Sequence, residues 1–126
     1  MKTLRVLSLL CLTCFLSGCG NERTIKGAFR LEQWEDGETY YLHRRSQDDS
    51  ASGGGIIEGT VRRLGWNNRF ILVDRHSNYR GDPDGWMIID VRSEKIIGPF
   101  TDAELRARSE ASGIQTYRIN EAWKKL

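Results

Sequence analysis

Apolar and polar residues alternate along much of this chain, a pattern typical of β-strands with one buried face. Phe29 and Leu31 alternate with polar neighbours, and Asp36-Gly37 stands between them and a second run, 40–42. An Asp-Gly pair between two such runs is typical of a β-hairpin. We therefore expect two antiparallel strands joined near residues 36–37.

Three further apolar runs predict the centre of a sheet; they cover residues 56–64, 69–74 and 86–91. Gly65-Trp66-Asn67-Asn68 separates the first two runs and predicts a turn. The last two runs are apolar at successive positions, so both faces of these strands are expected to be covered. After a turn at residues 92–95, Ile96-Ile97 predicts another strand, which ends at Gly98-Pro99-Phe100.

One helix is marked by its ends. Thr101 and Glu104 form a capping-box pattern, and Gly113 is placed to end a helix that runs to about Ser112. The expected apolar stripe consists of Phe100, Ala103, Ala107 and Ala111, with Leu105 to its side.

The C-terminal residues predict a last short strand around Tyr117 and Ile119. Asn120 is expected to cap a terminal turn that holds Trp123. The predicted fold class is α+β and mainly β: an antiparallel sheet of about six strands, one covering helix and a short C-terminal helical turn.

The N-terminus has a different pattern. Lys2 and Arg5 precede a nearly unbroken apolar run, Val6 to Leu16. This run is shorter than the roughly 20 residues that a spanning helix needs. A cationic start followed by a short apolar run predicts a secretory signal.

The sequence Leu16-Ser17-Gly18-Cys19 resembles the lipobox of bacterial lipoproteins. The resemblance implies a signal peptide at residues 1–18 and a lipidated Cys19. The polar residues up to Lys26 predict a short tether over 19–26, and the remaining chain has the size of a single globular domain, 27–126. The lipid on Cys19 would hold the protein in a membrane of the cell envelope. Gly20 stands where inner-membrane retention signals commonly have Asp, which favours the outer membrane if the host has two membranes.

Composition excludes several classes of function once the signal is removed. Cys11 and Cys14 leave with it, so Cys19 is the last cysteine and none remains for a disulfide, a thiolate metal site or a nucleophile. Loss of Lys2 and Arg5 leaves 17 basic residues against 17 acidic ones. This balance disfavours nucleic acid as a partner.

Four segments between residues 54 and 100 resemble a domain of unknown function that occurs in small bacterial lipoproteins; they are residues 54–61, 64–67, 86–90 and 98–100. These motifs are structural, and the resemblance implies no active site and no cofactor.

A zinc site is an alternative interpretation of Asp74 and His76. At strand spacing these two side chains lie on one face of the strand, where they could bind zinc together with Asp82 or Asp84. Their spacing does not fix a third ligand, and the competing interpretation is a strand end beside an exposed loop. Asp82-Pro83-Asp84-Gly85 is more typical of a tight turn than of a calcium site. We predict no metal site and no catalytic residue.

Seven arginines gather in the middle of the chain: Arg44, Arg45, Arg62, Arg63, Arg69, Arg75 and Arg80. They could form a face for anionic polymers or headgroups, with Arg62 and Arg69 as candidate contacts. A mixed, solvated surface competes with this interpretation, since acidic residues lie among them. The four tryptophans could stack on sugars, although most are expected in the core.

Residues 46–55 are rich in Ser and Gly and predict a flexible loop. Within it, Ser50-Ala51-Ser52-Gly53 resembles the loop that membrane-bound lysozyme inhibitors insert into their enzyme, which makes Ser50 and Ser52 candidate contacts.

We expect a non-enzymatic lipoprotein that serves as a binding or interaction module of the cell envelope. Its partners would be the membrane, through Cys19, and an envelope protein or polymer. The alternative is an inhibitor or immunity-type envelope protein that uses loop 46–55.

Overall fold

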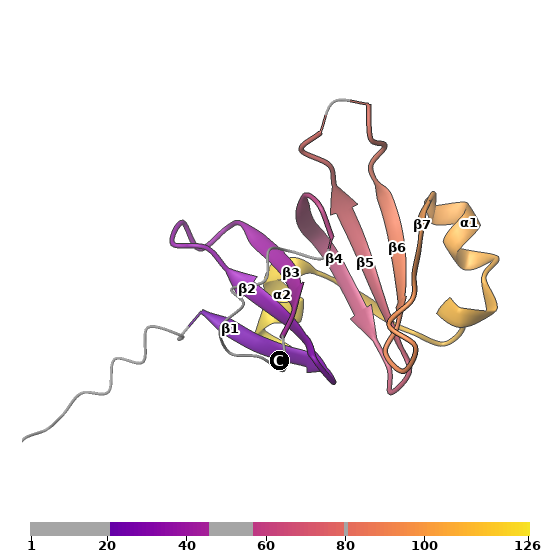
Figure 1. Ribbon diagram of the computed structural model, residues 1–126, viewed down its shortest axis with the longest axis horizontal. Coiled ribbons are helices and arrows are strands. Elements are labelled where there is room, and N and C mark those ends of the chain that lie inside the picture. Colours follow the sequence, from indigo (N-terminus) through magenta and orange to yellow (C-terminus); the bar gives the residue numbers. More distant parts are fainter. Residues whose placement is uncertain (1–20, 46–56, 80) are drawn as a thin grey trace, which may run out of the picture.

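The fold is mainly β, as the pattern predicts. The computed structural model describes residues 21–45, 57–79 and 81–126. In these residues, eight strands form one three-stranded and one five-stranded antiparallel sheet, and two short α-helices accompany them (Figure 1). The expectation of about six strands in one sheet is only roughly met, because the N-terminal strands form a sheet of their own.

The N-terminal sheet has the order β1-β2-β3, with β1 at Glu22–Lys26, β2 at Phe29–Gln33 and β3 at Tyr40–Arg44. The predicted hairpin is confirmed. The Asp36 carboxylate accepts hydrogen bonds from the backbone N–H groups of Glu38 and Thr39, at 2.9 and 2.8 Å. Gly37 has a φ of 71°, which a glycine adopts at no steric cost.

Residues 22–26 form a strand where the polar pattern predicts a tether. Backbone pairing with β2 orders this segment, and its single aliphatic side chain, Ile25, is buried. Arg23 lies over the ring of Trp123, with its guanidinium carbon 4.3 Å from the centroid. The fold therefore begins three residues after Cys19, so little chain is left for a tether.

The second sheet has the order β7-β6-β5-β4-β8. Its strands are β4 at Thr60–Trp66, β5 at Phe70–His76, β6 at Gly85–Asp90, β7 at Ile96–Phe100 and β8 at Thr116–Arg118. The turn expected at 65–68 comes later, because β4 continues through Trp66 and the Asn67 side chain accepts hydrogen bonds from the next backbone N–H groups. Strand β7 ends at Phe100, within the segment where its end is predicted.

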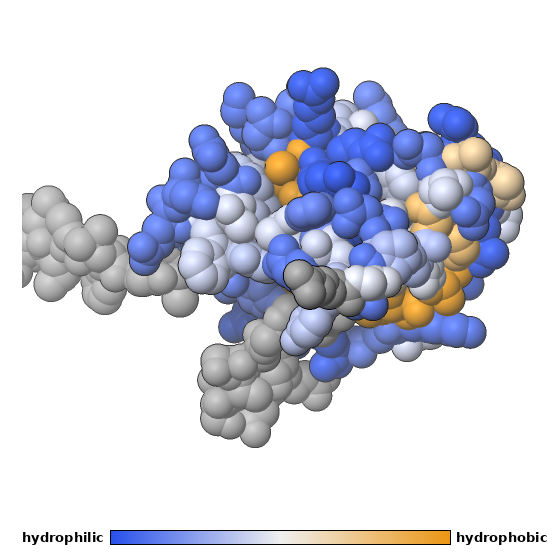
Figure 2. All heavy atoms as spheres, turned by 90° about the horizontal axis from the view of Figure 1, so that it is seen from above, coloured by the Kyte–Doolittle hydropathy of each residue, from blue (hydrophilic) through white to orange (hydrophobic). Residues whose placement is uncertain are grey.

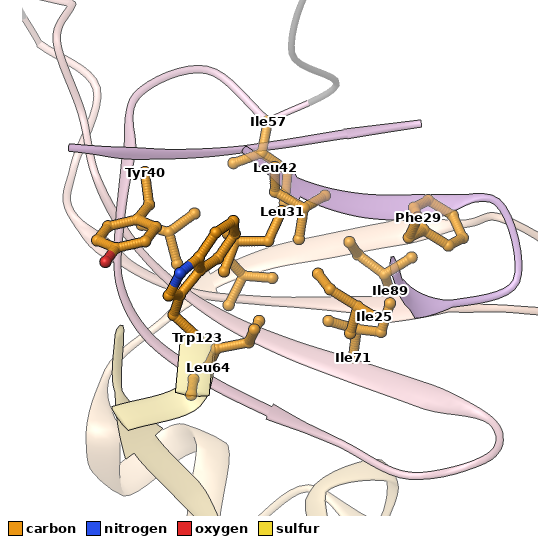
Figure 3. Packing of buried hydrophobic residues seen from close by; sticks show 13 residues of the cluster. Ile25, Phe29, Leu31, Tyr40, Leu42, Ile57, Leu64, Ile71, Ile89 and Trp123 are labelled. Carbon is orange, nitrogen blue, oxygen red and sulfur yellow. The ribbon is translucent and has the colours of Figure 1, made fainter. Parts of the chain in front are cut away.

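Two apolar clusters cover the two faces of the central strands, as predicted. The larger cluster lies between the sheets and includes Leu31, Leu42, Ile71 and Trp123 (Figure 3). The smaller lies on the opposite face, where Leu105 packs against Leu72, Trp86 and Ile88. Strands β5 and β6 are therefore buried on both sides.

The helix after β7 is shorter than expected. The capping box of Thr101 and Glu104 is confirmed, but α1 spans only Asp102–Arg106 and is followed by a separate 3₁₀ turn at Ser109–Ala111. The predicted apolar stripe is wrong in part. Phe100 and Ala111 pack against the smaller cluster, but Ala103 and Ala107 are exposed, and Leu105 is the residue of α1 that is buried against the sheet. Burial of a leucine side chain contributes more free energy than burial of an alanine, so α1 packs with its Leu105 face against the sheet.

The C-terminal helix α2, Ile119–Lys125, lies between the two sheets (Figure 1). Its N-cap is Arg118 and not Asn120 as expected. Trp123 is 9% exposed and packs on Tyr40 with ring centroids 5.6 Å apart. This helix therefore joins the two sheets into one core.

Candidate binding groove

A β-bulge in β4 brings two consecutive arginines to one carboxylate. The register between β4 and β5 shifts between Val61 and Arg63, so Arg62 is the extra residue. The Arg63 Nε donates to Asp74 Oδ2 at 2.7 Å, and an Arg62 guanidinium nitrogen donates to Asp74 Oδ1 at 3.3 Å. Bulges that redirect side chains in this way are over-represented beside functional sites.

Asp74 is buried, whereas the side chains of Arg62 and Arg63 are 48% and 40% exposed. Both carboxylate oxygens are already occupied by guanidinium donors. Asp74 therefore orients the two arginines at the surface and has little capacity left to bind a ligand itself.

The ion-pair network continues toward α1. Arg63 donates to Asp102 Oδ1 at 2.9 Å, and the Trp86 indole N–H donates to the same oxygen at 2.7 Å. The Trp86 hydrogen bond, followed by that of Arg63, lowers the pKa of Asp102 against the opposing effect of burial. Burial lowers the pKa of Arg63, but the bonds and charges of Asp74 and Asp102 outweigh it and raise that pKa. Arg63 is thus held as a fixed cation.

His76 bonds Asp84, with Nδ1 and Oδ2 3.0 Å apart. Asp84 also accepts from the Ser77 backbone N–H at 2.8 Å, and this bond is the main cause that lowers the pKa of its carboxyl. Asp74 and His76 therefore bind different partners. In the part of the chain that the structure describes, no three His, Cys, Asp or Glu side chains gather in a way that would hold a metal ion.

Arg62 and Arg63 line a groove of about 570 Å³ on the side of the molecule where β3, β4 and α2 meet. The groove residues are Glu38, Thr39, Tyr40, Thr60, Val61, Arg62, Arg63, Asp74, Arg118, Ile119 and Asn120. Arg118 is the cross-strand partner of Arg63, so the two cations lie on the same face of adjacent strands. Like charges placed directly opposite each other are destabilising, and the carboxylates of Asp74 and Asp102 offset this repulsion at Arg63. Guanidinium groups recognise carboxylate and phosphate through paired hydrogen bonds.

The second predicted arginine contact lies elsewhere. Arg69 lines a separate groove of about 590 Å³, together with Phe70, Ile88, Asp90, Ser93, Lys95, Ile97, Arg108, Ser109 and Glu110. Its guanidinium lies 3.6 Å from Asp90 and over the Phe70 ring. The structure thus assigns Arg62 and Arg69 to different surfaces.

Arg118 is a cationic residue of the groove that the sequence does not mark as a contact. It lies far along the chain from Arg63, in a strand of only three residues. No local motif marks it, because its relation to Arg63 comes from the pairing of β8 with β4.

The tryptophans separate into two groups. Trp86 and Trp123 are buried, and Trp66 is half-buried beside Tyr117, which confirms that most belong to the core. Trp34, in contrast, is 54% exposed.

Several predicted residues lie outside the described part of the chain. These are Cys19, with the rest of the lipobox, and Ser50 and Ser52 in loop 46–55. The lipid attachment and the lysozyme-inhibitor hypothesis therefore stay predictions.

Comparison with known proteins gives one match. A family model described as a protein of unknown function (DUF3997) matches residues 27–120. No curated protein and no solved structure matches this chain. Among the described residues, none of the helices has the length and apolar character to cross a membrane.

Proposed function

The chain belongs to the DUF3997 family of proteins of unknown function, and from that premise we propose that it is a non-enzymatic, lipid-anchored binding module of the bacterial cell envelope. The observation that carries the proposal is the lipobox-like Leu16-Ser17-Gly18-Cys19, which stands directly before the first strand at Glu22. In hosts with two membranes, Gly20 favours the outer one.

The anchor and the fold are close in the chain. Two residues, Gly20 and Asn21, separate Cys19 from Glu22. An extended chain covers at most about 3.5 Å per residue step, so lipid on Cys19 would hold the domain within about 10 Å of the membrane. Lipoprotein anchors carry at least two acyl chains, and two chains give lasting attachment. Such a module would meet its partner at the membrane surface.

The groove supports binding rather than turnover. Its buried carboxylate, Asp74, already accepts bonds from Arg62 and Arg63, and these bonds fix the cations before any ligand arrives. Arg118 adds a third cation on the same face as Arg63. Preorganised guanidinium groups favour a partner that presents carboxylate or phosphate groups, such as an acidic protein segment or an anionic envelope polymer.

The anchor is tested in a bacterial host that expresses the full chain. Incorporation of a clickable fatty acid and fractionation of the envelope are compared between the wild type and Cys19→Ser. We expect label and membrane association in the wild type and neither in the variant. Equal labelling of the two chains, or none in either, would contradict the anchor.

The groove is tested by capture from detergent-solubilised envelope, with a tag on the C-terminus. Arg118→Glu reverses an exposed charge in the groove, and Arg92→Glu makes the same change at an exposed turn outside it. We expect a stoichiometric partner that Arg118→Glu loses and Arg92→Glu retains. A partner held equally by both variants would contradict the groove as the contact site.

A further inference from the structure

Trp34 is an exposed aromatic residue without a structural role in either core. It follows β2 directly and is 54% exposed. Its ring packs on that of Tyr41 in β3, with centroids 5.5 Å apart and planes tilted by 56°. Among the described residues, Trp34 and Tyr79 are the exposed large hydrophobic side chains.

The Trp34–Tyr41 pair lies at the end of the molecule where the chain leads to Cys19. The Gln33 backbone N–H, next to Trp34, donates to the Asn21 carbonyl oxygen at 2.8 Å. Asn21 is two residues from Cys19, a reach of at most about 7 Å. In Figure 1 the start of β1 and the connection between β2 and β3 lie together at the left end of the molecule.

From this placement we propose that the Trp34–Tyr41 pair contacts the headgroup region of the lipid bilayer. The inference rests on the proposed lipid anchor at Cys19. Tryptophan and tyrosine favour the membrane interface, because their rings are apolar while their N–H and O–H groups reach water. The pair alone would bind weakly, but the anchor makes the contact intramolecular and raises the effective lipid concentration.

The surrounding charges decide which lipid surface fits. The turn beside Trp34 carries Glu35, Asp36 and Glu38. The hydrogen bond from the Thr39 side chain, followed by the backbone bonds, lowers the pKa of Asp36, so this carboxylate stays ionised. Exposed anions within a Debye length of an anionic surface are repelled. The pair therefore fits a zwitterionic surface.

The hydropathy of the surface around the Trp34–Tyr41 pair indicates how deeply the pair enters the bilayer. Figure 2 shows mostly hydrophilic residues over the three-stranded sheet and a group of apolar ones at the opposite end of the molecule. Contact at the headgroups, and not insertion into the hydrocarbon, suits this surface.

The experiment uses the chain from Cys19 onward, which contains every described strand, helix and core residue. Its single cysteine is coupled to a maleimide lipid in phosphatidylcholine vesicles that contain brominated lipid, a quencher of tryptophan fluorescence. Coupling supplies the anchor chemically, so the outcome is independent of whether a cell lipidates Cys19. Circular dichroism checks the fold of each variant before coupling.

We expect quenching in the wild type, its loss in Trp34→Phe, and no change in the matched control Tyr79→Ser, which removes the other exposed aromatic side chain. Replacing part of the phosphatidylcholine with phosphatidylglycerol should weaken the quenching. No quenching in the wild type, equal quenching in Trp34→Phe, or stronger contact on the anionic vesicles would overturn the proposal. Failure of the proposed anchor itself would appear separately, as absent fatty-acid labelling in cells.

Discussion

Asp74 and Arg63 are cross-strand partners in β5 and β4, and a bond of 2.7 Å joins the buried carboxylate of the first to the half-exposed guanidinium of the second. The bulge at Arg62 brings a second guanidinium to the same carboxylate. One buried anion thus positions two surface cations at the edge of the groove. The groove owes its electrostatic character to this arrangement.

Asp74→Asn should lower the free energy of unfolding by about 1.5 kcal/mol, the lower part of the range for hydrogen bonds to charged groups. The lower part applies because Arg62 and Arg63 are partly exposed and water screens their charges. Urea denaturation measures the change. Asp82→Asn makes the same charge change at an exposed position and should have no effect. Equal stability of Asp74→Asn and wild type would mean that the ion pair does not stabilise the fold.

Asp102 should make the stability depend on pH. Its folded-state pKa is lowered, chiefly by the Trp86 hydrogen bond, so its ionised form stabilises the fold above the ordinary carboxyl range near pH ~4. This contribution is lost as the pH falls through the lowered pKa. Thermal melts between neutral and acidic pH should therefore show a smaller acid loss in Asp102→Asn than in wild type. Asp36, Asp84 and Asp90 also have lowered pKa values, so some acid loss will remain in the variant. Identical pH profiles would refute the assignment.

Trp123→Ala should destabilise the protein by about 3–5 kcal/mol, the usual cost of removing a buried tryptophan. The Trp123 ring packs on Tyr40 from one sheet, and α2 continues directly from β8 of the other. Guanidinium denaturation measures the loss, and Lys124→Ala, an exposed change in the same helix, is the control. A loss of similar size in both variants would show that the buried ring does not carry the effect, because alanine is itself the strongest helix former.

Gly65→Ala should loosen the pairing of β8 with β4. A Cβ at this position would lie 2.6 Å from the backbone oxygen of Gln115, which a neighbouring strand cannot avoid without shifting. Overpacking of this kind costs about 1–3 kcal/mol. Hydrogen exchange should show faster exchange at residues 116–118 than in wild type, whereas unchanged protection there would contradict the close approach of the two strands.

The local parts of the fold could be predicted from sequence because neighbouring residues set them. Asp36-Gly37 predicts its hairpin through turn geometry, and Thr101 with Glu104 predicts its capping box through hydrogen bonds three residues apart. The buried face of α1 could not be predicted, since the sheet beneath the helix determines whether Leu105 or the alanines are buried. The length of α1 depends on the same packing. Residues 22–26 were predicted to be a tether for the same reason. Their strand forms only because β2 pairs with it and the core buries Ile25, and neither can be read from the polar local sequence.

What the sequence by itself determined is the mainly β class, the double burial of β5 and β6, and the lipobox-like motif that predicts an anchor. Each of these features depends on residues close in the chain, whose periodicity and spacing indicate which side chains are buried and which element forms. Tertiary structure alone decided that the strands divide into two sheets, that Arg118 faces Arg63, and that Trp34 lies exposed near Asn21. These relations join residues far apart in the chain, and their energies come from backbone pairing and burial that no local pattern encodes.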